Sequence, residues 1–395
     1  MDSRTLGIIT LLRSALKNEA LSLPDDFSWD GVANIIYEHH LVGMAVRGAA
    51  RCSVPRTTPA LKYLTALFCK DITTSRFQMK RLFDIYSAFE ENGIEYMPIK
   101  GAVIKPLYPQ SELRTMGDAD VLIRHEQYPE IKKILLSLGF SVDVESDHEY
   151  VWKDGDFTLE LHKRLIPSYN KDYYSYYGDG WRLARKSAQG SAYCLSPEDH
   201  FIYLVVHFAK HYRDGSISAK NVCDFYVYKK AHPDMDKAYL DCELEKLRLS
   251  EFYRNVLDLL DTWFEGKKPT EAVEIITETA FKGGIFSQEE SALAVSVIKL
   301  RDKTSSLSGV KRKAFLKGIF PPKSALINRY PILSKAPFLL PLIWIVRGFE
   351  IVFLHPERRK NSIDASQKLM NVSCERIEEY EARLRSVGLD FNFDG

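Results

Sequence analysis

The stretch from Tyr96 to Asp120 constrains the fold more than any other part of the sequence. Its first residues predict a short strand over 96–100, and Gly101 then predicts a tight turn into a short helix. Asp118 and Asp120 open a second strand. Because side chains alternate between the two faces of a strand, we expect both carboxylates on one face and the residues between them in the core.

A pair of carboxylates on one strand face is repulsive unless a cation neutralises it, and hard oxygen ligands suit Mg²⁺. A third acid, Glu160, lies in the alternating segment 157–163, on the face opposite to Leu159 and Leu161. Three acids from neighbouring strands predict a site for two Mg²⁺ ions. Such a pair of ions stabilises the attacking and leaving oxygens of an in-line phosphoryl displacement.

Groups that suit a triphosphate lie close to these acids in the sequence. Backbone N–H groups at Gly101 and the helix start are donors for phosphate oxygens. Lys100 and Arg114 are natural charge partners for the same phosphates. Two alternatives stay open, namely a salt bridge from Lys100 to one of the acids and a clamp of Arg114 on Asp118.

The order of predicted elements indicates an α+β protein. We expect an N-terminal helical region (1–94), a core of alternating strands and helices (95–165), a helical substrate region (166–300) and a C-terminal helical region (301–395). Asp154-Gly155 predicts a hairpin between two strands of the core. The elements expected with the clearest patterns are helices over 61–92, 126–138, 198–211, 218–230 and 363–387, and strands over 140–145, 149–153 and 157–163.

Composition excludes several classes of protein. Lysine and arginine number 54 against 53 aspartates and glutamates, so net charge alone demands neither nucleic acid nor a membrane. The six cysteines form no CxxC pair, which indicates reduced thiols, and the N-terminus lacks the pattern of a signal peptide, so we expect a cytoplasmic protein. The apolar stretch 337–354 is too interrupted to span a bilayer, and we expect it to form a buried helix.

Four motifs together resemble a known family, the uncharacterised bacterial nucleotidyltransferases of the polymerase-beta superfamily (the nucleotidyltransferase 5 group). They are Ile99-Lys100-Gly101, Leu107-Tyr108-Pro109, Arg114-x-x-Gly117-Asp118-x-Asp120 and Leu159-Glu160-Leu161-His162. The resemblance implies a polymerase-beta-like nucleotidyltransferase core, a mixed sheet with flanking helices. It also implies Mg²⁺-dependent transfer of an NMP from an NTP such as ATP to a hydroxyl acceptor, with two metal ions held by Asp118, Asp120 and Glu160.

More weakly, His207-x-x-x-His211 and Asp224 resemble the helical region of that family, and with His162 they are candidate acceptor-site residues. The acceptor stays open among a small molecule, a sugar, a protein and RNA.

The sequence departs from the wider superfamily at two positions, with Ala102 where a serine is usual and Glu160 where an aspartate is usual. These departures keep open a catalytically decayed module that binds a nucleotide or a partner. The stretch 299–323, with eight basic residues against one acid, keeps open RNA-directed, tRNA-like nucleotidyl transfer.

Overall fold

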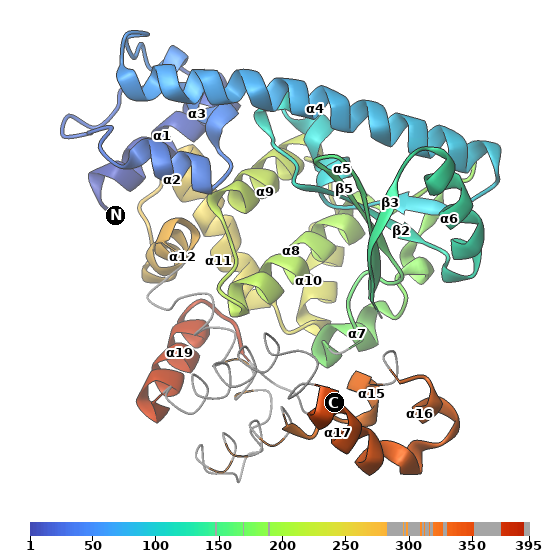
Figure 1. Ribbon diagram of the computed structural model, residues 1–395. Coiled ribbons are helices and arrows are strands. Elements are labelled where there is room, and N and C mark those ends of the chain that lie inside the picture. Colours follow the sequence, from blue (N-terminus) through green and yellow to red (C-terminus); the bar gives the residue numbers. More distant parts are fainter. Residues whose placement is uncertain are drawn as a thin grey trace. The chain divides into compact units, whose positions relative to one another are not determined.

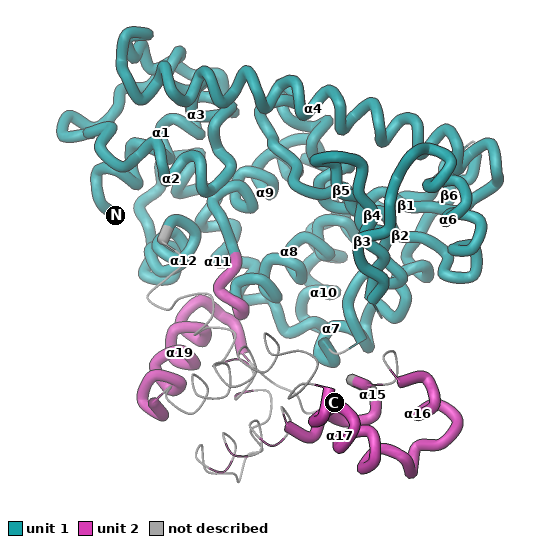
Figure 2. Tube along the Cα trace, viewed as in Figure 1, with its two compact units in different colours: residues 1–212, 217–285, 395 teal, residues 213–216, 286–394 magenta. Residues whose placement is uncertain are grey.

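The computed structural model describes most of the 395-residue chain (Figure 1). The described residues are 1–146, 148–168, 170–188, 190–282, 295, 298, 309, 312, 316, 319–326, 330–350 and 373–390. The chain divides into two compact units (Figure 2). The first comprises Met1–Tyr212, Ile217–Ile285 and Gly395, and the second comprises Arg213–Ser216 and Phe286–Asp394.

The first unit begins with four helices, α1 (Ser3–Lys17), α2 (Val32–Glu38), α3 (Val42–Arg51) and α4 (Pro59–Glu91). Helices α1 and α3 pack closely because Gly48 of α3 has no side chain. A Cβ atom at Gly48 would lie 2.0 Å from the carbonyl oxygen of Leu11 in α1. Helix α4 is 33 residues long and runs along the unit (Figure 1). It ends before Asn92 and the left-handed Gly93, as the sequence predicts.

The core of the fold is a mixed five-stranded sheet, which confirms the α+β class. Its strands are β1 (Tyr96–Pro98), β2 (Asp118–Ile123), β3 (Ser141–Glu145), β4 (Glu149–Asp154) and β5 (Phe157–His162), in the order β1-β2-β5-β4-β3. Strands β2 and β5 are parallel and the other neighbours are antiparallel. The short helix α5 (Gly101–Ile104) follows β1, and α6 (Tyr128–Ser137) follows β2.

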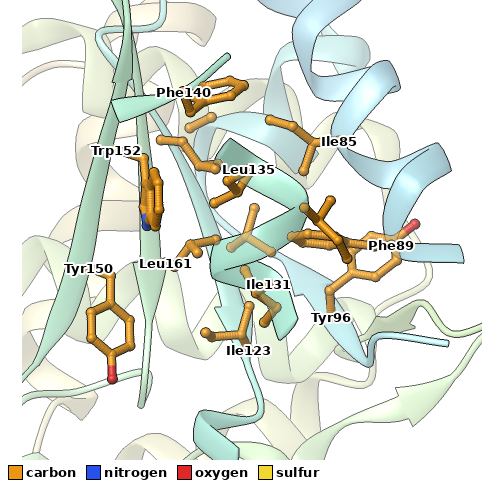
Figure 3. Packing of buried hydrophobic residues seen from close by; sticks show 14 of the residues in the cluster. Ile85, Phe89, Tyr96, Ile123, Ile131, Leu135, Phe140, Tyr150, Trp152 and Leu161 are labelled. Atoms are coloured by element: carbon orange, nitrogen blue, oxygen red, sulfur yellow. The ribbon is translucent and has the colours of Figure 1, made fainter. Parts of the chain in front are cut away.

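One face of the sheet is covered by α4 and α6 (Figure 3). Ile85 and Phe89 of α4 and Ile131 and Leu135 of α6 pack with buried side chains of β2, β4 and β5. The alternating residues Ala119, Val121, Ile123, Leu159 and Leu161 all belong to this cluster. The predicted alternation is therefore confirmed, and the acids of β2 and β5 lie on the opposite face.

Helices predominate after the sheet. They are α7 (Lys171–Tyr177), α8 (Pro197–Arg213), α9 (Ala219–Ala231), α10 (Lys237–Lys246), α11 (Ser250–Leu260) with a π-helical turn at Asp261–Glu265, and α12 (Glu271–Lys282); β6 (Arg185–Lys186) pairs with β7 (Tyr193–Cys194). The 3₁₀ turns are Lys105–Leu107, Ser111–Leu113, His125–Gln127, Trp181–Leu183 and Pro337–Leu339. The hydroxyl of Ser196 accepts from the backbone N–H of Asp199 at 3.0 Å, so Ser196 caps α8 as predicted.

The second unit contains α15 (Lys323–Leu326), α16 (Ile332–Lys335), α17 (Leu340–Phe349) and α19 (Cys374–Ser386). The expectation of a buried helix over 337–354 is wrong for α17, since Ile343 is its only buried residue and Leu342, Ile345 and Phe349 are exposed. Apolar residues occur on all sides of this helix, and the small cluster around Leu333 covers one side. Most of the basic stretch 299–323, and residues 363–372 of the last predicted helix, lie outside the described residues.

Two further expectations concern cysteines and membranes. All six cysteines are described, and each is a free thiol. Within the described ranges, no helix combines the length and the apolar character needed to cross a bilayer.

Candidate active site

The register of the sheet brings two of the three predicted metal ligands together. Asp120 of β2 lies directly opposite Glu160 of the parallel strand β5. Asp120, Glu160 and His162 each offer one donor atom, and these three atoms lie within 4.8 Å of one another. Two strands whose paired residues are 40 positions apart in the chain thus build one compact set of metal-ligating groups.

Asp120 is the most constrained of these groups. Its side chain is buried, and its Oδ1 accepts from Lys100 Nζ at 2.6 Å and from His162 Nε2 at 2.7 Å. Although burial opposes ionisation, Lys100 and His162 hold the pKa of Asp120 well below its ordinary value. Burial and Lys100 oppose protonation of His162, but its contacts with Asp120 and Glu160 raise the pKa of this imidazole. Asp120 is therefore a carboxylate held by the ammonium of Lys100 and the imidazole of His162.

Asp118 differs from Asp120 in its surroundings. It begins β2, its side chain is exposed, and it lies outside the 4.8 Å set. Desolvation by its surroundings and the charges of Asp120 and Glu160 raise the pKa of Asp118. In the part of the chain that the structure describes, no ion pair neutralises it. The three acids therefore carry more negative charge than Lys100 alone balances.

Lys100 forms a salt bridge with Asp120, which is one of the two alternatives that the sequence left open for this lysine. Its backbone has φ 48° and ψ −119°, a conformation that costs a non-glycine residue roughly 1–3 kcal/mol. Its carbonyl accepts from the N–H groups of Val103 and Ile104. Gly101 and Ala102 come before Val103 in the chain. Their N–H groups are therefore donors that have no acceptor within the helix.

Gly101 is required by a close approach of Arg114. A Cβ atom at Gly101 would lie 2.9 Å from Nη1 of Arg114, whose guanidinium is buried. Arg114 in turn donates to both carboxylate oxygens of Asp224 in α9, at 2.7 and 2.8 Å. The hydroxyl of Tyr108 donates to the same carboxylate at 2.7 Å. The structure thus joins Arg114, predicted to contact phosphate, with Asp224, predicted near the acceptor, in one buried ion pair.

Lys105 is a functional-site neighbour that sequence reasoning missed. Its side chain is fully buried, and its ammonium donates to the carbonyl of Arg114. Burial and the charge of Arg114 lower the pKa of Lys105 to about 8. Lysines are rarely fully buried, and no local sequence pattern around this one indicates that it would be.

A Lys105→Met variant is expected to change the pH dependence of stability. Between about pH 8 and pH 10.5 the unfolded chain keeps a proton on Lys105 that the folded chain has released, so this residue makes stability rise with pH. Below this window, the buried charge destabilises the wild type relative to the variant. Urea unfolding from about pH 7 to pH 10 measures the free energy of unfolding of both proteins. The amount by which this free energy is larger for Lys105→Met than for the wild type should decrease as pH rises. A difference independent of pH would contradict the assigned pKa.

The candidate acceptor-site histidines of α8 form a pair. Nε2 of His207 and Nε2 of His211 are 3.0 Å apart, so one ring donates and the other accepts. Burial lowers the pKa of both, and the charges of Lys100 and, for His207, His162 contribute. His207 is therefore a neutral imidazole within electrostatic reach of Lys100 and His162.

The comparison with protein families agrees with the resemblance described above. A family model described as Uncharacterised nucleotidyltransferase matches residues 25–265, which include every candidate site residue named here. The chain belongs to this family. The matched residues include the mixed sheet that carries Asp118, Asp120 and Glu160.

Two solved structures of one protein are also similar. The solution structure of the antibiotic-resistance factor ANT(2'')-Ia is 16% identical and covers 49% of this chain and 100% of its own, with a TM-score of 0.32. The crystal structure of ANT(2'')-Ia in complex with adenylyl-2''-tobramycin is 15% identical and covers 44% of this chain and 97% of its own, with a TM-score of 0.34. No curated protein matches the chain.

Proposed function

We propose that this nucleotidyltransferase transfers an NMP from an NTP to a hydroxyl acceptor in an Mg²⁺-dependent reaction. The observation that carries the proposal is the pairing of Asp120 with Glu160 across β2 and β5, with the unneutralised Asp118 on the same face. Asp118, Asp120 and Glu160 offer only oxygen ligands and surplus negative charge, so the donor set fits Mg²⁺. Bound there, two Mg²⁺ ions would supply charge stabilisation at the attacking and leaving oxygens.

The side chains around the acids have distinct roles in this proposal. The N–H groups of Gly101 and Ala102, together with the ammonium of Lys100, bind triphosphate oxygens. The acceptor oxygen bonds to the α-phosphorus, the bond to pyrophosphate breaks, and a carboxylate takes the hydroxyl proton. Asp118 suits that last role, because its side chain is exposed, whereas Lys100 and His162 already donate to the buried carboxylate of Asp120.

In this proposal the other predicted residues do not contact the phosphates directly. His162 orients the carboxylate of Asp120 through its 2.7 Å hydrogen bond. The Arg114–Asp224 ion pair fixes the loop between Gly101 and β2, and we assign it this positioning role. His207 and His211 supply the polar surface toward the acceptor.

Replacement of Lys100 separates its charge from its backbone strain. Both Lys100→Ala and Lys100→Gly remove the ammonium, and we expect each to slow nucleotidyl transfer by roughly 10²-fold, a typical loss for one charged contact. Glycine adopts φ 48° without the steric cost that alanine has there. The free energy of unfolding of Lys100→Gly, measured with urea, should therefore exceed that of Lys100→Ala by about 1 kcal/mol. Equal stability of the two variants would contradict the strained conformation.

The activity is tested by incubating the protein and Mg²⁺ with each α-labelled NTP and fractions of a cell extract. We expect label to pass to one acceptor fraction with release of pyrophosphate. The matched control is the Asp118→Asn, Asp120→Asn double variant, checked to be folded by circular dichroism. Mg²⁺-dependent pyrophosphate release by that double variant would sink the proposal.

Two observations favour a second function, that of a decayed binding module. Lys100 already neutralises Asp120 at 2.6 Å, and Ala102 offers no hydroxyl to phosphate. Calorimetric titration with Mg²⁺–NTP in parallel with the transfer assay separates the two functions. Tight binding with no turnover in any acceptor fraction would favour the binding module.

A further inference from the structure

A second set of ligand atoms lies beside the acids, on the same face of the sheet. Glu149 at the start of β4 lies directly opposite His162 of β5, and His148 precedes it. His148, Glu149 and His162 each offer one donor atom, all within 4.8 Å of one another. This set contains two imidazoles and one carboxylate, whereas the proposed Mg²⁺ ligands are all carboxylates.

His162 has one ring nitrogen that its other contacts leave free. Its Nε2 is directed to Asp120 at 2.7 Å. Among the described residues its buried Nδ1 has no hydrogen-bond partner, and the acid oxygen paired with it there is Oε2 of Glu149, at 3.6 Å. The side chain of His162 is only 3% exposed. An unpaired ring nitrogen in such a place is costly unless something binds it.

We propose that His148, Glu149 and His162 bind a transition-metal cation of the zinc class, through Nε2, Oε2 and Nδ1 respectively. This site is separate from the Mg²⁺ ligands and does not depend on the proposed nucleotidyl transfer. Two imidazoles and a carboxylate form the ligand set of open zinc sites, in which water completes the coordination.

The observed separations suit a metal better than hydrogen bonds. Oε2 of Glu149 lies 3.6 Å from Nδ1 of His162 and 3.9 Å from Nε2 of His148, which is too long for hydrogen bonding. Ligands at about 2.1 Å from a tetrahedral ion are about 3.4 Å apart. Small side-chain rotations would therefore bring the three atoms to metal-binding distance.

Contacts around the ligands hold them in place. The hydroxyl of Ser146 accepts from the N–H groups of His148 and Glu149, at 3.2 and 3.0 Å, and the N–H of Lys163 donates to the carbonyl of His148 at 3.0 Å. The hydrogen bond from Nε2 of His162 to Asp120 fixes the tautomer in which Nδ1 carries the lone pair. Metal-ligating histidines characteristically donate their other ring N–H to a carboxylate in this way.

This arrangement couples the two sites through one imidazole. A cation on Nδ1 of His162 would keep the proton on Nε2, and so maintain the hydrogen bond that orients Asp120. The transition metal would act as a positioning element for the acid face, and loading of one site would affect the other.

The test uses the full-length, metal-free protein and Co²⁺ alone, without nucleotide. Tetrahedral Co²⁺ with imidazole ligands absorbs strongly in the visible range, whereas octahedral Co²⁺ on carboxylates and water absorbs weakly. We expect one equivalent of Co²⁺ to give the strong spectrum and one equivalent of Zn²⁺ to abolish it. His148→Ala and Glu149→Gln should each weaken Co²⁺ binding by more than about 100-fold, because loss of a residue that merely orients a ligand costs about 10–100-fold.

Two variants control for the neighbouring groups. Asp118→Asn alters the acid face and His207→Gln alters the histidine pair of α8, and both should keep the strong spectrum. The inference is overturned by a weak octahedral spectrum, by a strong spectrum that survives His148→Ala in a folded protein, or by its loss in Asp118→Asn or His207→Gln. Because no nucleotide is present, absence of nucleotidyl transfer would leave this result unaffected.

Discussion

Asp120→Asn is expected to reduce nucleotidyl transfer on the order of 10³-fold, the largest effect of any single substitution in the site. Asn keeps the size of the side chain but removes the charge that we propose holds a cation between Asp120 and Glu160. It also leaves Lys100 and His162 without the carboxylate to which both donate. The assay is label transfer from the NTP at saturating Mg²⁺, with the rate referred to folded protein.

A companion variant separates catalysis from stability. Removing one partner of a buried ion pair destabilises a protein by about 3–5 kcal/mol, so Asp120→Asn should unfold at lower urea. Adding Lys100→Met removes the orphaned ammonium and should recover most of that stability, while transfer stays lost. If the double variant were as active as Lys100→Met alone, Asp120 would be a structural residue and not a metal ligand.

Arg114→Met is expected to destabilise the fold by about 3–5 kcal/mol, the largest effect away from the acids. It leaves the buried carboxylate of Asp224 with Tyr108 as its remaining hydrogen-bond donor among the contacts described above. Adding Asp224→Leu removes the uncompensated charge, and the pair Arg114→Met, Asp224→Leu should be closer to wild type than either single variant. Urea unfolding of the four proteins measures this coupling.

Tyr108→Phe is the matched control for the same cluster. It removes one hydrogen bond to Asp224 and should cost about 1 kcal/mol. Additive losses in the Arg114 and Asp224 variants, with no coupling, would contradict a bidentate ion pair between them.

The sheet could be predicted from the sequence because its signals are local. Alternation placed Asp118 and Asp120 opposite the core. The Asp154-Gly155 turn joins strands in which Asp154 pairs with Phe157, and this register puts Glu149 opposite His162. The second ligand set could therefore have been found by continuing the predicted hairpin five residues back from its turn.

The contacts of the charged side chains could not be predicted in the same way. Arg114 and Asp224 are 110 residues apart, and their pairing depends on how α9 packs against the loop before β2. The burial of Lys105 could not be predicted either, because lysine side chains are usually exposed. The exposed apolar side chains of α17 show the converse, because hydrophobicity indicates a preference for burial without specifying what covers the helix.

The central claim is that Asp118, Asp120 and Glu160 hold divalent cations beside an NTP. It is tested most directly by crystals grown with Mn²⁺ and a non-hydrolysable NTP analogue, with diffraction measured at a wavelength where manganese scatters anomalously. The account predicts anomalous peaks between these three carboxylates, with the triphosphate next to Lys100 and Gly101. Analogue bound elsewhere, or bound here with no manganese peak at Asp120 and Glu160, would contradict it.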